Sequence, residues 1–257
     1  MNIIGWFADP SHWSGATGIP ARLLEHLSYS ALAIVIGVVI AVPIGAAVGH
    51  TGRGGFLIVG LANWLRSLPD LGLLIVFVLL LSLNLVPLVL ALLVLAVPPL
   101  LAGTYSGISN VDRAVVDAAR GMGMREREIL LKAELPNALP LLLGGLRAAT
   151  LQVVATTAIA AYVSYGGLGR YLIDGKAQHD YPQMAAGAML IAALALVVEG
   201  ILATVQRLVV SPGLLVDERR RRPPAEPGGP PLSEPLSDAP VSGEGQDRST
   251  DEMAGAN

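Results

Sequence analysis

Long runs of apolar residues, separated by short polar segments, dominate this chain of 257 residues. A run of about 20 apolar residues is long enough to cross the roughly 30 Å of a bilayer's hydrocarbon core as an α-helix. A helix also satisfies its own backbone hydrogen bonds, which lipid cannot do. We therefore expect an all-α integral membrane protein with about five transmembrane helices, at residues 27–48, 56–83, 86–108, 138–163 and 184–207.

The second of these runs shows signs of a broken helix. A straight helix over residues 56–83 would be about 42 Å long at 1.5 Å per residue, which exceeds the hydrocarbon core. Pro69 lies inside this run, between Arg66 and Asp70. Because proline has no N–H and its ring clashes with the preceding turn, we expect a broken or strongly tilted helix at mid-depth.

The composition agrees with a membrane domain. Hydrophobic residues make up 53% of the chain and charged residues 14%, whereas about a quarter of the residues in an average soluble domain are charged. The mean hydropathy is +0.60. The chain has no cysteine, which excludes disulfides and thiolate metal sites, and no pair of its four histidines has metal-ligand spacing. We expect no metal site and no cofactor bound by this chain.

The two ends of the chain differ from its apolar middle. Residues 1–20 hold Trp6 and Trp13 among polar residues, which predicts a loose leader at the membrane interface, where tryptophan is favoured. This leader lacks the basic start and sustained apolar core of a cleavable signal peptide. Residues 214–257 are rich in proline, glycine, serine and acidic residues, so we expect a disordered tail. The transmembrane domain then covers residues 21–213.

The basic residues predict the orientation in the membrane. Five spans place the two termini on opposite sides. One set of polar segments contains Arg53, the charged segment between the third and fourth runs, and an arginine cluster at residues 219–222. The other set contains Arg22, Arg170 and Lys176. Because cytoplasmic loops carry an excess of lysine and arginine, we place the N-terminus outside and the tail in the cytoplasm.

The charged segment, at residues 111–136, is the longest polar interruption between the first and last apolar runs. The part before Gly121 can form one short helix, and the part after Gly123 can form a second helix up to Glu134. The glycines separate the two because glycine favours turns over helix interiors, and Pro136 is expected to stop the second helix. Such a compact unit is suited to contacting a partner in water. A solvated loop that merely joins two spans is the alternative.

The spacing within this segment resembles a known motif. Permease subunits of binding-protein-dependent ABC importers carry a cytoplasmic loop that reads E-A-A, three residues, G, nine residues, I, one residue, L-P. The chain departs from this pattern in two places, with Asp117 for Glu and Ala133 for Ile. In that family the loop docks on the ATPase subunit and transmits its motion to the membrane helices. The residues to which the resemblance assigns this coupling role are Asp117, Ala118, Ala119, Gly121, Gly123, Leu135 and Pro136.

The resemblance implies partners that this chain does not supply. The sequence contains no G-x-x-x-x-G-K-[ST] phosphate loop, so ATP and Mg²⁺ would be bound by a separate ATPase. We expect two ATPase subunits, a second permease subunit that is identical or homologous, and a separate extracytoplasmic solute-binding protein. The chain itself would be a transport subunit and not an enzyme, in the cell membrane of a prokaryote, and no nucleic-acid partner is expected.

Five stretches, DAARGMGM at 117–124 and four others, are similar to the osmoprotectant branch of this family, whose members carry glycine betaine, choline, carnitine or proline. Importers of methionine, taurine or nitrate share the loop and remain an alternative, as do an ATP-independent channel or secondary transporter and a membrane scaffold. Because aromatic residues, which hold quaternary amines by cation–π attraction, are few in the apolar runs, we expect the binding protein to select the solute. The other four stretches are NWLRSLPDLGLL at 63–74, TYSGISNVD at 104–112, KAELPNALPLLLGGLRAAT at 132–150 and SYGGLG at 164–169.

Polar residues inside the apolar runs are candidates for the transport pathway, because charges are costly in lipid. Arg66 and Asp70, on either side of Pro69, are the candidates for a gate, since a broken helix near the midplane often marks a transport site. Thr156 and Thr157 are further candidates, with hydrogen bonding to their own helix as the alternative.

Arg147 and Glu199 are the other charged residues inside apolar runs, in the fourth and fifth runs. Both fall on the half of their run that is predicted to be cytoplasmic, at similar depth. We expect them to form a structural ion pair, with a role in lining or gating the pathway as the alternative.

Overall fold

The computed structural model describes residues 3–210, and this part of the chain contains helices and turns without a strand. The predicted tail at residues 214–257, including the arginine cluster, lies outside the described residues. The helices are α1 (Ile3–Ala8), the 3₁₀-helix η1 (Pro10–Trp13), α2 (Ile19–Thr51), α3 (Gly55–Arg66), α4 (Asp70–Leu81), α5 (Leu85–Ser109), α6 (Arg113–Gly121), α7 (Glu126–Ile129), the π-helix η2 (Leu130–Glu134), α8 (Leu135–Thr157), the 3₁₀-helix η3 (Ala158–Val163), α9 (Gly169–Gln178) and α10 (Tyr181–Val209).

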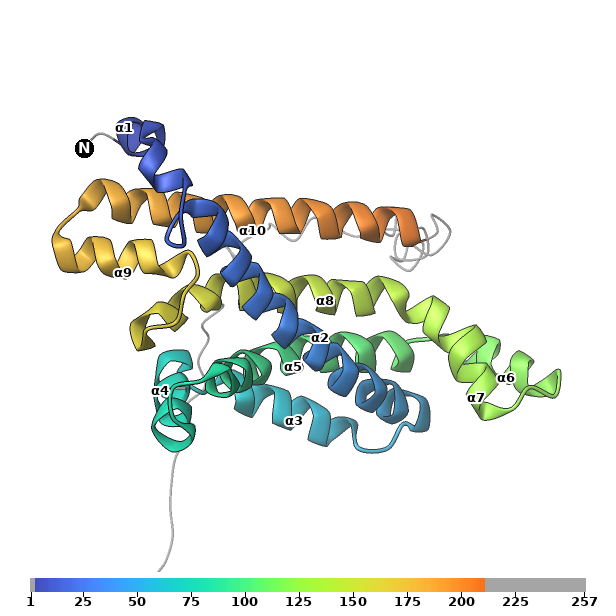
Figure 1. The fold of residues 1–257 in the computed structure, drawn as a ribbon. Coiled ribbons are helices and arrows are strands. Elements are labelled where there is room, and N and C mark those ends of the chain that lie inside the picture. Colours follow the sequence, from blue (N-terminus) through green and yellow to red (C-terminus); the bar gives the residue numbers. More distant parts are fainter. Residues whose placement is uncertain (1–2, 211–257) are drawn as a thin grey trace, which may run out of the picture. The chain divides into compact units, whose positions relative to one another are not determined.

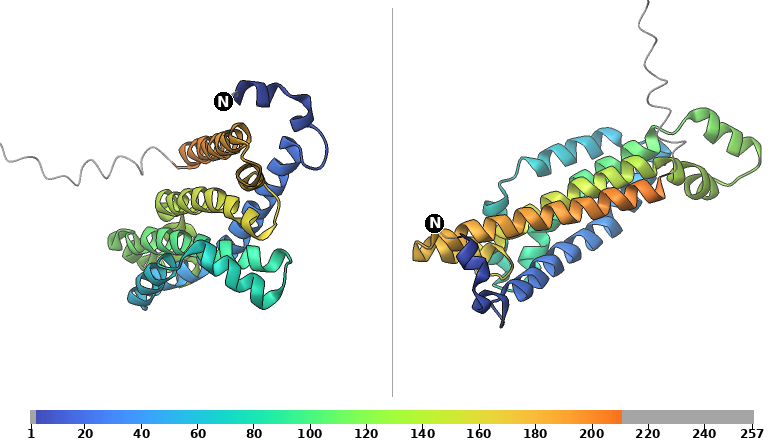
Figure 2. Two further views of the ribbon diagram at one scale, coloured as in Figure 1. Left: turned by 90° about the vertical axis from the view of Figure 1, so that its left-hand side faces the viewer. Right: turned by 90° about the horizontal axis from the view of Figure 1, so that it is seen from above.

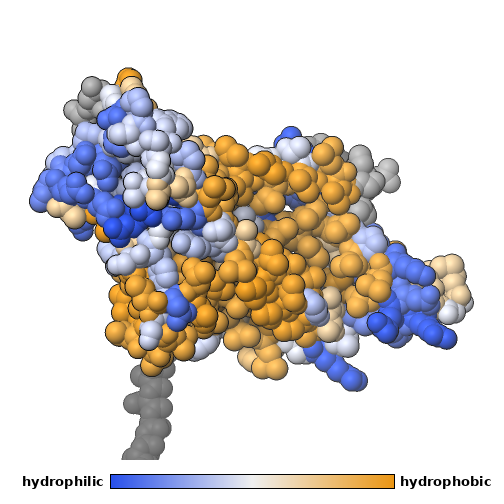
Figure 3. Space-filling model, viewed as in Figure 1, coloured by the Kyte–Doolittle hydropathy of each residue, from blue (hydrophilic) through white to orange (hydrophobic). Residues whose placement is uncertain are grey.

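Four helical runs are long and apolar enough to cross a membrane: α2, α5, α10 and the continuous run Glu126–Val163, which includes α8. The bent pair α3 and α4 makes a fifth crossing if it counts as one span. Apolar side chains gather over the middle of these helices, and hydrophilic residues lie at the end with α6 and α7 and at the opposite end (Figure 3). Such a broad exposed apolar band is suited to contact with lipid. The predicted all-α membrane fold is confirmed.

Small residues allow α2 to lie close to α5. A Cβ atom built on Gly45 would lie 2.9 Å from the Cβ of Thr104 on α5, and one on Gly49 would lie 2.8 Å from the Cβ of Ile108. In lipid, helices associate through such close van der Waals contacts because no hydrophobic force drives them together. The buried small residues of α2 recur every fourth position, at Ala33, Gly37, Ala41, Gly45 and Gly49.

The contact between α5 and α8 is closer still. A Cβ atom built on Gly145 of α8 would lie 2.6 Å from the carbonyl oxygen of Pro99 and 3.0 Å from the Cα of Gly103. The backbones of the two helices therefore touch at this point. Since α5 packs along both α2 and α8, it is the central helix of the bundle (Figure 1).

The break predicted in the second span is present. α3 ends at Arg66, α4 begins at Asp70, and the two helices are bent by 86°. Pro69 adopts an extended conformation between them, with φ −73° and ψ 118°. Its lack of an N–H and its fixed φ account for the interruption. α4 consequently lies at the end of the bundle opposite α6 and α7 (Figures 1 and 2).

Two polar segments, the predicted leader and the stretch between α8 and α10, are helical and packed. The prediction of a loose leader is wrong for residues 3–13, because α1 and η1 are helical there and Trp6 of α1 is only 7% exposed. The loop between the fourth and fifth spans contains α9, which lies along α10 (Figure 1). The Trp6 and Tyr171 rings meet edge to face with centroids 5.4 Å apart. Each segment thus buries aromatic surface on the other, which neither can do alone.

The helix after Gly123 does not stop at Pro136, so that expectation is wrong. The chain stays helical from Glu126 to Val163, and the π-helical turn at Leu130–Glu134 directly precedes the proline. In this wider turn the Leu135 N–H bonds to the carbonyl of Leu130, five residues earlier. Pro136 then occupies the first turn of α8, where a proline ring and a missing N–H are tolerated.

Candidate functional site

The charged segment (residues 111–136) folds as two helical parts joined by a glycine turn, at one end of the bundle (Figures 1 and 2). The Asp112 carboxylate begins α6 by accepting a 2.9 Å hydrogen bond from the Ala114 N–H, as N-cap residues do. α6 ends at Gly121, and Gly123 then adopts a φ of +80°. Only glycine occupies this left-handed region without steric cost, so the turn depends on Gly123.

Ion pairs connect the two helical parts. The Arg120 guanidinium on α6 donates to both carboxylate oxygens of Glu126 on α7, at 2.9 and 3.1 Å. Glu126 beside it raises the pKa of Arg120 above its ordinary value. Within the second part, the Glu128 carboxylate accepts from the Arg125 N–H at 3.0 Å and lies 3.2 Å from the Lys132 ammonium group. The fork-shaped pair at Arg120 fixes the angle between the parts as well as joining them.

A small apolar cluster fills the space between the two parts. Ala119 of the motif is 3% exposed and Ile129 is fully buried. Ala133, the departure from the family pattern, packs against the same cluster. Ala119 therefore has a structural role inside the segment. The cluster consists of Val116, Ala119 and Ile129, with Val111, Met124 and Ala133 packed against them.

α6 also presents an apolar face to solvent. Val115 is 42% exposed and Met122 is 76% exposed, and Ala118 lies between them on the same side of the helix. The Asp117 side chain is exposed next to this face and lies 3.6 Å from Arg120. An exposed methionine with small neighbours, bordered by charges, is typical of a surface that a partner covers.

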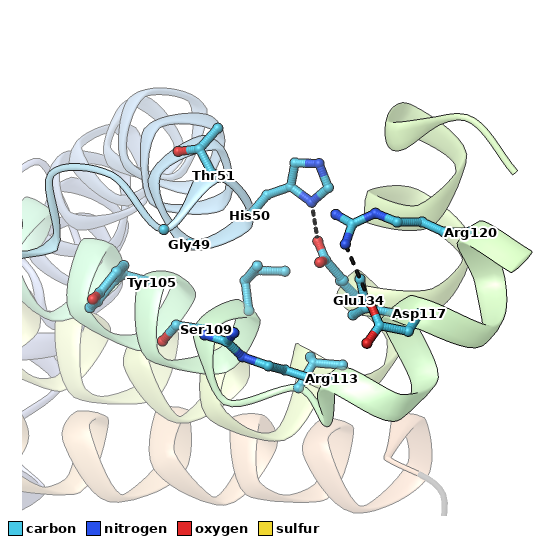
Figure 4. Close-up of a pocket in the computed structure, with 13 residues that line it drawn as sticks. Gly49, His50, Thr51, Tyr105, Ser109, Arg113, Asp117, Arg120 and Glu134 are labelled. Carbon is cyan, nitrogen blue, oxygen red and sulfur yellow. Dashed lines mark hydrogen bonds and ion pairs between the residues drawn. The ribbon is translucent and has the colours of Figure 1, made fainter.

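The charged segment is attached to the membrane helices by an apolar cluster and by His50. Leu135 of the motif packs with Ala138 of α8 against α2 and α5, whereas Pro136 is exposed. His50, in the last turn of α2, contacts Glu134 with Nδ1 at 2.6 Å from the carboxylate (Figure 4). A hollow of about 440 Å³ lies beside this contact, lined also by Tyr105 and Arg113.

Sequence reasoning missed His50. It follows an apolar run at the start of a glycine-rich turn, and its partner Glu134 is 84 residues further along the chain. No local pattern marks such a pair. Its position at the end of a span, on the same predicted side as the charged segment, was the one signal available.

The structure does not bring the gate candidates together. Arg66 is exposed at the end of α3, and Asp70 is half-buried at the start of α4. Among the described residues they form no ion pair with each other. The Thr157 hydroxyl is fully buried, donates to the carbonyl of Val153 at 2.7 Å and lies 3.0 Å from the hydroxyl of Ser30. The hydroxyl thus contacts both its own helix and α2, and a role of Thr157 in the pathway stays a prediction.

Thr156 is half-buried on the same helix, and a role in the pathway stays a prediction for Arg66, Asp70 and Thr156 alike. Thr157 differs from them because its hydroxyl joins two helices.

Arg147 and Glu199 form an ion pair that joins α8 to α10. The Arg147 guanidinium also donates to the Gln206 side-chain oxygen at 2.6 Å. The Gln206 amide in turn donates to the carbonyl of Pro140 at 3.2 Å. The predicted ion pair is present, and a charge inside a span is tolerated when it is paired in this way. A role of the pair in lining or gating the pathway stays the alternative.

Glu199→Gln is expected to lower the thermal stability of the purified protein, because it leaves the Arg147 charge without its counter-ion inside the spans. Thermal unfolding in detergent or lipid nanodiscs measures this. Arg207→Gln is the matched control, since Arg207 is exposed near the same end of α10 and should leave the melting temperature unchanged. Equal melting temperatures for the two variants would contradict a structural role for the pair.

Together these features define a helical membrane protein of the transport-permease class, with one water-exposed two-helix segment. The fold is that of ABC importer permeases. It is similar to a chain of the MetNI methionine ABC transporter in an inward-facing conformation, with a TM-score of 0.67 and 22% sequence identity over 79% of this chain and 99% of that one. It is also similar to a chain of an amino acid ABC transporter solved with histidines, with a TM-score of 0.56 and 19% identity over 86% of this chain and 99% of that one.

The chain belongs to the family of binding-protein-dependent transport system inner membrane components, whose model matches residues 33–216. It is 33% identical to the glycine betaine/carnitine/choline transport system permease protein OpuCB of Bacillus subtilis. The 190 matched residues cover 74% of this chain and 88% of that protein. It is 32% identical to the choline transport system permease protein OpuBB of the same organism, over 75% of this chain and 89% of that protein. The osmoprotectant import permease protein OsmW of Salmonella typhimurium is 30% identical to it, over 74% of this chain and 91% of that protein. The protein is thus a multi-pass membrane transport subunit.

Proposed function

We propose that this protein is the permease subunit of an ATP-driven importer for quaternary-amine osmoprotectants, namely glycine betaine, choline and carnitine, with proline as a further solute. The similarity to permeases named for these solutes, over most of their length, carries the proposal. The chain forms the translocation pathway together with a second permease subunit, identical or homologous. A separate extracytoplasmic binding protein delivers the solute.

The exposed face of α6 is where the ATPase docks in this proposal. Two ATPase subunits bind ATP and Mg²⁺, one on each permease. The surface around Val115, Ala118 and Met122 supplies apolar contact area, and Asp117 orients the partner by its charge. The Arg120–Glu126 pair makes the two helical parts move as one body, so that a push on α6 reaches α8.

The proposed orientation places the charged segment in the cytoplasm. The ends of α2, α5 and α10, the start of α3 and the charged segment lie at one end of the bundle, and α9 and α4 lie at the other (Figure 1). The end with the charged segment holds Arg53, Arg207 and the five basic residues of that segment, whereas the other end holds Arg22, Arg66, Arg170 and Lys176, and this excess supports a cytoplasmic location. The N-terminus is then outside.

Deleting the gene is expected to remove uptake of labelled glycine betaine, choline or carnitine after a salt upshift, and to leave methionine uptake unchanged. A chromosomal copy of the intact gene should restore the uptake. Loss of methionine uptake alone would retain the permease fold and overturn the solute class. Uptake that persists without any ATPase copurifying with the chain would overturn the ATP-driven mechanism.

A further inference from the structure

We propose that His50 is a positioning residue that couples movement of the charged segment to α2. This inference rests on the proposed docking of an ATPase on α6. The charged segment follows α5 and precedes α8 in the chain, so its movement reaches those two helices through the backbone. α2 is not adjacent to the segment in sequence, and within residues 3–210 the hydrogen bonds and ion pairs between them are those of the His50 side chain.

His50 uses both ring nitrogens in this connection. Nδ1 lies 2.6 Å from the Glu134 carboxylate, and Nε2 lies 3.2 Å from the Glu126 carboxylate. The two carboxylates lie at the two ends of the helical part that begins at Glu126, and one imidazole bridges them. The histidine side chain is only 13% exposed, so the ring is held in place by its surroundings.

Each carboxylate connects His50 to a different moving part. Glu126 is also the partner of Arg120 at 2.9 Å, which extends the connection to α6, where the partner docks. Glu134 has a side chain that is only 6% exposed and closes the π-helical turn before Pro136. A buried carboxylate needs a hydrogen-bonding or charged partner, and within residues 3–210 His50 is the one hydrogen-bonded to Glu134. Movement of either part therefore pulls on the end of α2.

α2 is also joined to other elements near its opposite end. His26 bonds to the Val154 carbonyl at 2.9 Å, and the Ser30 hydroxyl meets Thr157 on α8 at 3.0 Å. The Glu25 carboxylate accepts a 2.8 Å hydrogen bond from the Gly167 N–H, in the turn before α9. A displacement of α2 at His50 is thereby transmitted to the far side of the protein, where the solute enters in the proposed orientation.

The test is the number of solute molecules imported per ATP hydrolysed by the purified complex with its ATPase in proteoliposomes, using glycine betaine, choline and carnitine as probes. For His50→Ala we expect this ratio to fall roughly tenfold, in the range of typical coupling between sites. ATPase copurification and the rate of ATP hydrolysis should stay at the wild-type level. His50→Lys should restore the ratio, because an ammonium group can donate to both carboxylates.

Thr51→Ala is the matched control, because the neighbouring Thr51 hydroxyl donates only to the carbonyls of its own helix, at Ala47 and Val48. If His50→Ala fails to insert, His50→Gln serves instead, since an amide can reach one carboxylate but not bridge two. A wild-type ratio in the variant that inserts would overturn the inference, and so would equal losses of ATPase copurification and uptake. A wild-type chain that captures no ATPase would overturn the proposed function first, and this inference with it.

Discussion

Gly123→Asp is expected to abolish uptake while the protein still inserts into the membrane at normal levels. Gly123 has a φ of +80°, a region that costs most residues about 1–2 kcal/mol and that aspartate occupies less readily than glycine. No atom lies within 4 Å of a Cβ built on it, so the fold has room for a side chain. The change therefore acts on the turn and on the docking surface beside Met122. It strains the turn that joins α6 to α7 and adds a charge where a partner approaches.

Gly200→Ala is the matched control for this variant. Gly200 is also surrounded by open space, but it lies in α10 with a helical backbone, where alanine is favoured. The uptake of this control variant should match that of the wild type.

Removing residues 117–125 should abolish uptake as Gly123→Asp does. Uptake of the labelled solute, the amount of protein in the membrane and ATPase copurification are the three measurements. Normal transport by a correctly inserted Gly123→Asp protein would refute the coupling role of the segment.

Gly145→Leu is expected to prevent stable folding, since α5 and α8 touch at this residue. Even a Cβ atom would lie 2.6 Å from the Pro99 carbonyl oxygen, and backbone atoms cannot swing aside as a flexible side chain can. Overpacking of a tight interface costs about 1–3 kcal/mol, and occasionally more. Here the helices must separate along their length. The protein should be depleted from the membrane and should unfold at a lower temperature.

Gly144→Leu provides the control one residue earlier on the same helix. No atom lies within 4 Å of a Cβ built on Gly144, so leucine there enters open space on the apolar surface. Replacing a helical glycine also removes a backbone cost of about 0.5–1 kcal/mol. The amount of this variant in the membrane, and its unfolding temperature, should equal or exceed the wild-type values. Similar losses in the two variants would show that the α5–α8 contact does not govern stability.

Several features followed directly from local properties of the chain. The hydropathy pattern predicted the spans because a helix in lipid needs an unbroken apolar length. Pro69 predicted the break between α3 and α4 because proline interrupts the hydrogen-bond ladder of any helix. Gly121 and Gly123 predicted the turn in the charged segment, where Gly123 has the positive φ that glycine allows. The resemblance to the permease motif then identified the family.

Local properties also misled where a second element changed the outcome. Pro136 looks like a helix stop, but the preceding π-helical turn accommodates it and the helix continues into α8. The polar, glycine-rich stretch between α8 and α10 looks like a loop, but it contains α9 because Tyr171 is buried against α1. In the first case the π-helical turn accommodates the proline, and in the second case α1 provides the surface against which Tyr171 is buried.

By itself, the sequence determined the class of this protein: an all-helical membrane permease with a broken second span and a two-helix charged segment. These features depend on hydropathy, on proline and glycine, and on motif spacing, all of which are properties of short stretches. The tertiary structure alone decided that His50 bridges Glu126 and Glu134, and that Gly103 meets Gly145. Those contacts join residues far apart in the chain, and they exist only once α2, α5 and α8 have packed together.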